Sequence, residues 1–406
     1  MLKLMLNSIY LLLAQASALL IPLFLLPLLT RYYGLSDVAL YIFSVSVISF
    51  SYLIFDFGLS TYGIKKSAEV EYCQAKISKL FSITLTVKFL FFLLVFLVVG
   101  IVFYINQNNS YIKVVVFSFI SIFFQSLIPY WLFQSINKMK VVTLINVASR
   151  LSSIIISVFF VFFGFDIYSV ILATGFGWVI ASCVSLKYLN SLGYTVSVIV
   201  SREPLILFFK EVRDFYLSRL AVSSYLYSNV FILSTLSAVN LAVYGVADYI
   251  YKIIQSLVSV VTQALFPQIA ESKDYTIFFK TLFLLLLFIF IIGLFFKLYS
   301  HDVIQLLYGP SYLLAIPFIE AFIVLALFNV LSVTFGYPAA SLFSKYDYVN
   351  YSSYFCLIVY FCGVVVLYLV NAISPLHLIY TLIASEICTF LWRLSFFVKY
   401  YKLQKV

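Results

Sequence analysis

Residues 277–299 read IFFKTLFLLLLFIFIIGLFFKLY, a stretch that is apolar throughout except for one lysine near each end. About 20 apolar residues span the hydrocarbon core of a bilayer as an α-helix, so this stretch predicts a transmembrane helix. The whole chain of 406 residues has the same character, with 64% hydrophobic, 20% aromatic and only 10% charged residues. Soluble domains are about 45–50% apolar, so the composition excludes soluble enzymes and nucleic-acid-binding proteins.

Eleven further apolar stretches of similar length lie before or after this one in the chain. The sequence therefore predicts an all-α, polytopic membrane protein with twelve transmembrane helices in two six-helix lobes. Residues 1–190 are predicted to form the N-terminal lobe, 191–213 a cytoplasmic connection and 214–406 the C-terminal lobe. The twelve predicted helices lie at about 9–30, 38–59, 81–105, 112–134, 141–163, 168–189, 215–237, 241–265, 277–299, 312–335, 350–370 and 375–398.

The basic residues predict how the chain crosses the membrane. With both termini in the cytoplasm, 17 of the 25 Lys and Arg residues fall on the cytoplasmic side and three on the outer side, with the remaining five inside predicted helices. Cytoplasmic loops carry an excess of Lys and Arg, so this count supports both the number of helices and their orientation. We therefore expect a multi-pass membrane protein with cytoplasmic N- and C-termini.

The sequence predicts neither an enzyme nor a cofactor or metal site. Its two histidines, His301 and His377, lie far apart, and its five cysteines form no C-x-x-C pair. It has no glycine-rich phosphate loop, and no loop is long enough to hold a soluble catalytic domain. Any function is therefore expected to lie within the helical bundle.

A weak internal repeat agrees with the division into two lobes. Residues 35–38, at the start of the second predicted helix, read LSDV, and residues 236–239, at the start of the eighth, read LSAV. These are equivalent positions in the two halves. Parallel repeats of this kind are an architecture of membrane transporters.

Charged residues inside the predicted helices are the candidates for function, because a charge at membrane depth costs roughly 2.5–3.5 kcal/mol on insertion scales. Lys88, Arg219 and Arg393 lie close to cytoplasmic helix ends, where a long basic side chain can instead reach the headgroups. The deeper charges are Arg150, Asp248, Lys252, Glu320 and Glu386.

Asp248 and Lys252 are four residues apart on one predicted helix, so they share a face and can form an ion pair. Two interpretations remain open. The pair either neutralises itself as part of the structure, or it faces a hydrated cavity in which Lys252 binds an anion and Asp248 exchanges a proton.

Several short motifs resemble those of the Wzx-type polysaccharide flippases, which belong to the MATE-like multidrug/oligosaccharidyl-lipid/polysaccharide exporter superfamily. Residues 129–139, PYWLFQSINKM, are similar to the family's P-x-W-x-F-Q-G-x-E-x-M, but Ser135 and Asn137 stand where the family often has Gly and Glu. Residues 56–68 begin Asp-Phe-Gly-Leu and match the family pattern D-F-G-L-x-x-x-G-x-R-x-x-A with Lys65 at its basic position. Residues 31–34, RYYG, match the turn after the first helix, and Pro267 matches a proline at the inner end of the eighth.

The resemblance implies a V-shaped pair of lobes around a central basic cavity. It also implies alternating-access transport of undecaprenyl-pyrophosphate-linked oligosaccharide units, such as O-antigen units, from the cytoplasmic to the periplasmic leaflet. A polysaccharide polymerase and a chain-length regulator are the implied protein partners. The candidates for binding the anion are Arg150, Lys252, Arg219, Lys88 and Arg31, and those for ion coupling are Asp248, Glu320 and Glu386.

The sequence contains no ATP-binding motif, so we expect transport to be driven by an ion gradient or by removal of the product. The alternative is a cation-coupled multidrug exporter of the same superfamily. A cavity for cationic drugs would favour acidic residues, and the partly basic set of deep charges argues against it.

Overall fold

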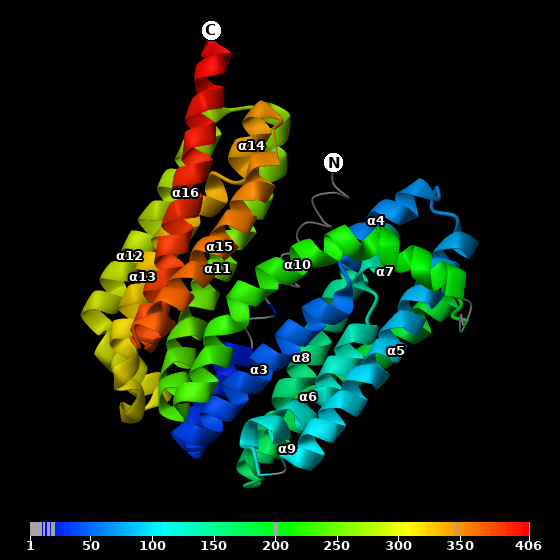
Figure 1. Ribbon diagram of the computed structural model, residues 1–406, viewed down its shortest axis with the longest axis horizontal. Coiled ribbons are helices and arrows are strands. Elements are labelled where there is room, and N and C mark those ends of the chain that lie inside the picture. Colours follow the sequence, from blue (N-terminus) through cyan, green and yellow to red (C-terminus); the bar gives the residue numbers. More distant parts are fainter. Residues whose placement is uncertain are drawn as a thin grey trace. The chain divides into compact units, whose positions relative to one another are not determined.

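The computed structural model describes residues 10, 13, 17 and 21–405, apart from 107, 198–201 and 346. Every regular element in this described part is helical (Figure 1). The elements of the first half are a π-helical turn η2 (Ile21–Leu25), α2 (Leu26–Tyr32), α3 (Leu35–Asp56), α4 (Leu59–Glu69), α5 (Gln74–Ile105), α6 (Ser110–Leu127), α7 (Tyr130–Ser135), α8 (Met139–Phe162) and α9 (Ile167–Ser191). Those of the second half are α10 (Arg202–Leu236), α11 (Ala238–Ser272), α12 (Tyr275–Tyr308), a 3₁₀ turn η3 (Pro310–Ala315), α13 (Ile316–Thr334), α14 (Tyr337–Phe343), α15 (Asp347–Leu369) and α16 (Pro375–Lys405).

Ten helices in the described residues are long and apolar enough to cross a membrane, where the sequence predicts twelve. Part of the first predicted span, 9–30, falls on residues outside the described part, and its residues 21–30 lie in η2 and α2. The seventh, 215–237, is helical but forms the second part of α10 and is not among the ten. Polar residues such as Asn229 make that stretch less apolar than the others.

The chain divides into two compact units, residues 1–227 (unit 1) and 228–406 (unit 2). The boundary falls inside α10, and the predicted cytoplasmic connection, 191–213, ends in the first three turns of that helix. The connection is thus partly helical and continuous with the element that follows it.

The two units repeat one packing pattern. In unit 1, α6 packs against α3, α5 and α9, α8 packs against α9, and the short helix α7 packs against α4. In unit 2, α13 packs against α11, α12 and α16, α15 packs against α16, and the short helix α14 packs against α11. The weak sequence repeat is therefore accompanied by a repeat of helix contacts.

The two best-defined sequence motifs meet where α4 packs against α7. Phe57 and Gly58 both adopt the left-handed conformation, with φ of 51° and 71°, and this ends α3 and allows α4 to start in a new direction. On α4, a Cβ at Gly63 would lie 2.6 Å from the indole ring of Trp131 on α7. Only glycine leaves room for this ring, which is 2% exposed.

Helices α8 and α9 are held together by small residues. Ser149, Ser153 and Ser157 lie four residues apart on α8 and are each no more than 2% exposed. The Ser153 hydroxyl donates to the Thr174 carbonyl of α9 at 2.7 Å, and a Cβ at Gly177 would lie 2.0 Å from the Ser149 carbonyl. Small residues allow this close backbone approach, which is how helices associate in lipid.

Candidate functional site

Arg150 is a predicted anion-binding residue that lies against an aromatic ring. It lies on α8, and its guanidinium carbon is 5.7 Å from the centre of the Trp178 ring of α9, a cation–π contact. Its buried Nε has no hydrogen-bond partner in the part of the chain that the structure describes. One turn earlier on α8, Asn146 accepts a hydrogen bond of 2.7 Å from Tyr130. The Nε donor of Arg150 is therefore unused within the described part of the chain.

Lys88 is turned into the protein and not toward the headgroups. Its side chain is 4% exposed, and its amine donates to the Ser126 carbonyl at 2.7 Å. That carbonyl lacks its helical partner because Pro129 has no N–H and Tyr130 donates to Ile128 instead. The amine therefore caps the C-terminal end of α6, where the helix dipole favours a positive charge.

Asp248 and Lys252 form the ion pair that their spacing predicts, with 2.6 Å between the Asp248 carboxylate and the Lys252 amine. Asp248 is nearly buried, whereas 36% of the Lys252 side chain is exposed, and its amine lies 5.5 Å from the Tyr249 ring centre. The pairing alone is compatible with both interpretations that the sequence leaves open.

A buried polar cluster on α10, α11 and α15 was missed by the sequence analysis. The Tyr360 hydroxyl donates to the Asn229 side chain at 2.5 Å, and the Asn229 amide donates to the Tyr244 hydroxyl at 3.0 Å. Ser228 donates to Tyr360 at 2.7 Å. Tyr244 precedes Asp248 by one turn of α11, so the cluster borders the ion pair. The only sequence signal is Asn229, a polar residue inside an apolar stretch.

Glu386 and Arg393 of α16 belong to a second polar cluster in unit 2. Glu386 accepts hydrogen bonds from Asn329 at 3.0 Å and from the Ser332 hydroxyl. Arg393, which is 9% exposed, donates to the Ser332 carbonyl and to Ser352, both at 2.7 Å. The helical partner of that carbonyl, the Gly336 N–H, donates to Val333 instead. Arg393 therefore caps the end of α13 and does not snorkel.

The three remaining candidates lie elsewhere. Glu320 forms an ion pair of 3.0 Å with Lys297, and both side chains are exposed, at 46% and 73%. Arg31 is exposed in the last turn of α2. Arg219 lies on α10, but its side chain is outside the described part of the chain. The structure thus groups Asp248 with Lys252 and surrounds Glu386 with polar partners, without joining all eight candidates.

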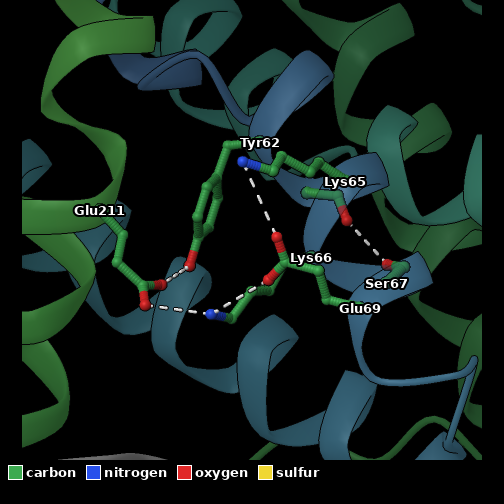
Figure 2. A network of polar contacts seen from close by, with 7 residues as sticks. Tyr62, Lys65, Lys66, Ser67, Glu69 and Glu211 are labelled. Carbon is green, nitrogen blue, oxygen red and sulfur yellow. Dashed lines mark hydrogen bonds and ion pairs between the residues drawn. The ribbon is translucent and has the colours of Figure 1, made fainter.

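A further polar network lies outside the predicted spans of unit 1, on α4 and the start of α10 (Figure 2). Glu211 accepts hydrogen bonds from the Tyr62 hydroxyl and, at 3.0 Å, from the Lys66 amine. Lys66 also lies 3.5 Å from Glu69, which in turn is 3.8 Å from Lys65. The network ties α10 to α4.

Hydrogen bonding perturbs the titration of this network. The Tyr62 and Lys66 donors lower the pKa of Glu211 below its usual value. The bond to Glu211 raises the pKa of Lys66, and burial together with the same bond raises the pKa of Tyr62. Both members of the ion pair therefore stay charged across the physiological pH range.

The residues that the structure describes hold no group of three or more His, Cys, Asp or Glu side chains suited to a metal ion. The polar groups of the spans are single cations, hydroxyls, amides and carboxylates. Such groups bind and release an ion or a polar headgroup by hydrogen bonding and charge.

The repeated helix packing and the polar groups within the spans are those of a membrane transporter. The fold is shared with a solved structure of the lipid II flippase MurJ in an inward closed conformation, with a TM-score of 0.77 over 97% of this chain and 87% of that one. It is also shared with an outward-facing multidrug resistance MATE family transporter of the MOP superfamily, with a TM-score of 0.62 over 98% of this chain and 96% of that one. Both are 14% identical, so the likeness shows the fold.

The chain belongs to the polysaccharide biosynthesis protein family, whose model matches residues 4–273. It is 28% identical to a protein of Shigella dysenteriae named "Putative O-antigen transporter", over 66% of this chain and 68% of that one. It is 25% identical to a protein of the same name from Escherichia coli K12, over 66% of this chain and 65% of that one. The chain thus spans about two thirds of each relative's length, and both relatives carry the name of a transporter.

Proposed function

We propose that the protein moves a lipid-linked oligosaccharide of the O-antigen type across the bacterial inner membrane, from the cytoplasmic to the periplasmic leaflet. Support comes from membership of the polysaccharide biosynthesis family and from the name shared by its two relatives. The observation that carries the proposal is Arg150, a guanidinium within a span that has no hydrogen-bonded or ionic partner in the described part of the chain.

The chemistry of such a substrate explains why a bundle with few deep charges is suited to it. A polyprenyl-pyrophosphate-linked glycan combines an anionic diphosphate, a polar sugar unit and a long apolar tail. The tail can stay in the lipid while the headgroup crosses, so the protein must replace water only for the headgroup. Arg150 of unit 1 and Lys252 of unit 2 are each a candidate for donating to the diphosphate, because a guanidinium and an amine are the usual phosphate ligands of proteins.

Energy for transport is proposed to come from an ion gradient. Asp248 and Glu386 are the two deep carboxylates in polar surroundings, and either can exchange a proton or a sodium ion during a transport cycle. Glu320 does not enter this proposal, because it is exposed and paired with Lys297.

The proposed arrangement in the membrane has twelve spans and cytoplasmic termini. The seventh span is the second part of α10, and the first comprises residues 9–30. Single cysteines introduced at Lys138 and Asn108 of a cysteine-free chain test this arrangement with an impermeant thiol reagent on intact cells. We expect labelling at position 108 only, and labelling at 138 would reverse the orientation.

Transport is tested by deleting the gene in its own host and restoring it with variants, so that the native sugar unit is present. We expect Arg150→Ala to abolish surface polysaccharide and to accumulate the lipid-linked precursor, while the protein inserts at a normal level. Lys345→Ala, which removes an exposed cation outside the predicted spans, is the matched control and should restore display. Full display with Arg150→Ala would overturn the role of this residue.

The same strains distinguish the alternative function. A multidrug exporter would raise resistance to cationic drugs and leave surface polysaccharide unaffected by the deletion. Loss of polysaccharide with unchanged drug resistance supports the flippase.

A further inference from the structure

Unit 1 contains a pocket of about 320 Å³ where the start of α5 faces α4 and the start of α10. Three lysines line it, Lys66, Lys76 and Lys79, and its walls include apolar residues such as Leu80, Ile83 and Leu207. Among the lining residues that the structure describes, Glu211 is the only acidic one. The pocket is therefore cationic and apolar at the same time, and the proposed transport function does not use it.

Two of the three lysines carry charge that the protein does not neutralise. Lys66 is paired with Glu211 at 3.0 Å, and Glu211 also accepts a hydrogen bond from Tyr62, so that carboxylate is fully engaged. Lys76 and Lys79 are exposed and have no hydrogen-bond or ion-pair partner among the residues that the structure describes. They lie three residues apart on α5, so their like charges face the same pocket and repel each other unless an anion lies between them.

The apolar side of the pocket is continuous with a surface that suits lipid. Leu80 and Ile83 lie at the beginning of the third predicted span, which places the lysines at the depth of the headgroups. On the first turns of α10, Ile206, Leu207 and Phe209 expose 67%, 56% and 49% of their surface. Exposed apolar side chains next to basic ones are typical of a helix that lies in the membrane interface.

We propose that this pocket binds the phosphate of an anionic phospholipid from the adjacent leaflet. Lys76 and Lys79 hold the phosphate, and the first part of an acyl chain lies along Leu80 and Leu207. A free phosphate ion is also an anion but gains nothing from the apolar wall. The pocket chemistry therefore favours the lipid as the occupant.

Binding is measured on the purified full-length protein in mild detergent, with a fluorescent phosphatidylglycerol as probe and the matching phosphatidylcholine as the uncharged reference. We expect Lys76→Gln/Lys79→Gln to weaken phosphatidylglycerol binding about tenfold or more, because each basic residue near a membrane surface contributes on the order of 1 kcal/mol. Lys138→Gln/Lys140→Gln removes two exposed lysines of the same unit that do not line the pocket, and should bind as the unaltered protein does.

Three further outcomes keep the proposal open to contradiction. Lys76→Arg/Lys79→Arg should restore binding, which separates the charge from any effect on folding. Leu207→Ser should weaken binding of the lipid. A large excess of inorganic phosphate should not displace the bound lipid. Equal binding by both double-glutamine variants would overturn the site, whereas complete displacement by phosphate would overturn the lipid as its occupant. None of these results depends on whether the protein transports a glycan.

Discussion

Each unit has a break between a long helix and a short one, between α6 and α7 in unit 1 and between α13 and α14 in unit 2, and the two breaks are stabilised in different ways. In unit 1, α6 ends before Pro129, and the amine of Lys88 donates one hydrogen bond to its free carbonyl. In unit 2, α13 ends before Gly336, and Arg393 donates both to the free carbonyl and to Ser352 of α15. A cation caps each break, but only the arginine joins three helices.

This difference suggests that the two breaks differ in rigidity. A lysine amine on a flexible stem can exchange one carbonyl for another acceptor at low cost. A guanidinium that donates in two directions fixes the helices that carry its acceptors, and Glu386 strengthens this fixation through its bond to Ser332. We therefore expect the break in unit 1 to tolerate movement that the break in unit 2 resists.

The largest effect is expected from Arg393→Met. The substitution removes two hydrogen bonds and leaves a buried carbonyl and a buried hydroxyl without donors, at about 1–3 kcal/mol for each. Thermal unfolding in detergent, followed by the loss of the monomer peak in size-exclusion chromatography, measures the effect. Arg393→Lys should keep one of the two hydrogen bonds, so its melting temperature should lie between those of the parent and Arg393→Met. A parental melting temperature for the methionine variant would contradict this role for Arg393.

Lys88→Met should destabilise the protein by less, on the order of 1–3 kcal/mol, because one buried carbonyl loses its donor. The same unfolding measurement applies, and Lys88→Arg is the conservative control because it keeps a donor and the charge. If Lys88→Met cost as much stability as Arg393→Met, the two breaks would not differ as described.

Gly63→Ala is expected to cost about 1–3 kcal/mol, because the added methyl group overlaps the Trp131 ring at 2.6 Å. It tests the contact between α4 and α7, whose counterpart in unit 2 lies between α11 and α14. Gly100→Ala is the control, since a Cβ there meets no atom within 4 Å. Intrinsic fluorescence of the tryptophans should report the displacement, and equal stability of the two alanine variants would exclude tight packing at Gly63.

The smallest effect concerns pH and the Lys66–Glu211 pair. The pKa of Glu211 is lowered, so the pair stabilises the protein above the usual glutamate pKa of about 4.3 and is lost as pH falls through the lower, folded-state value. The pKa of Lys66 is raised, so its contribution is present below the usual lysine pKa of about 10.4 and is lost at more alkaline pH. With 31% of each side chain exposed, the contribution is about 1 kcal/mol or less.

Unfolding of Glu211→Gln against the parent at pH 7 and at about pH 4, near the glutamate pKa, measures this contribution. The difference between the two proteins should shrink at the lower pH. A difference that stayed constant would mean that the pair has no electrostatic effect on stability.

Sequence reasoning works well for features that are local in the chain. Apolar stretches locate the helices, and the i, i+4 spacing predicts the Asp248–Lys252 pair. Seven of the eight candidate residues have described side chains, but the partners of Lys88 and Glu320 could not be foreseen. Those partners lie 38 and 23 residues away and depend on how separate helices pack.

Other features of the structure were not predicted, for a related reason. The Asn229–Tyr360 contact joins residues 131 apart, and tyrosines are common throughout this chain, so nothing singles out Tyr360. The capping roles of Lys88 and Arg393 depend on carbonyl groups, which every residue has. A sequence shows where a cation lies along a helix but not which backbone oxygen lacks a donor.

The serines of α8 and the glycine of α9 have a mechanical consequence. Where backbones approach so closely that a methyl group at Gly177 would overlap a carbonyl, the two helices cannot slide past each other without first moving apart. Lipid chains cannot enter the contact between the two helices. Changes in membrane thickness or lateral pressure therefore act on α8 and α9 as on a single rigid unit. When unit 1 deforms, we therefore expect it to bend at its broken helices and not along α8 and α9.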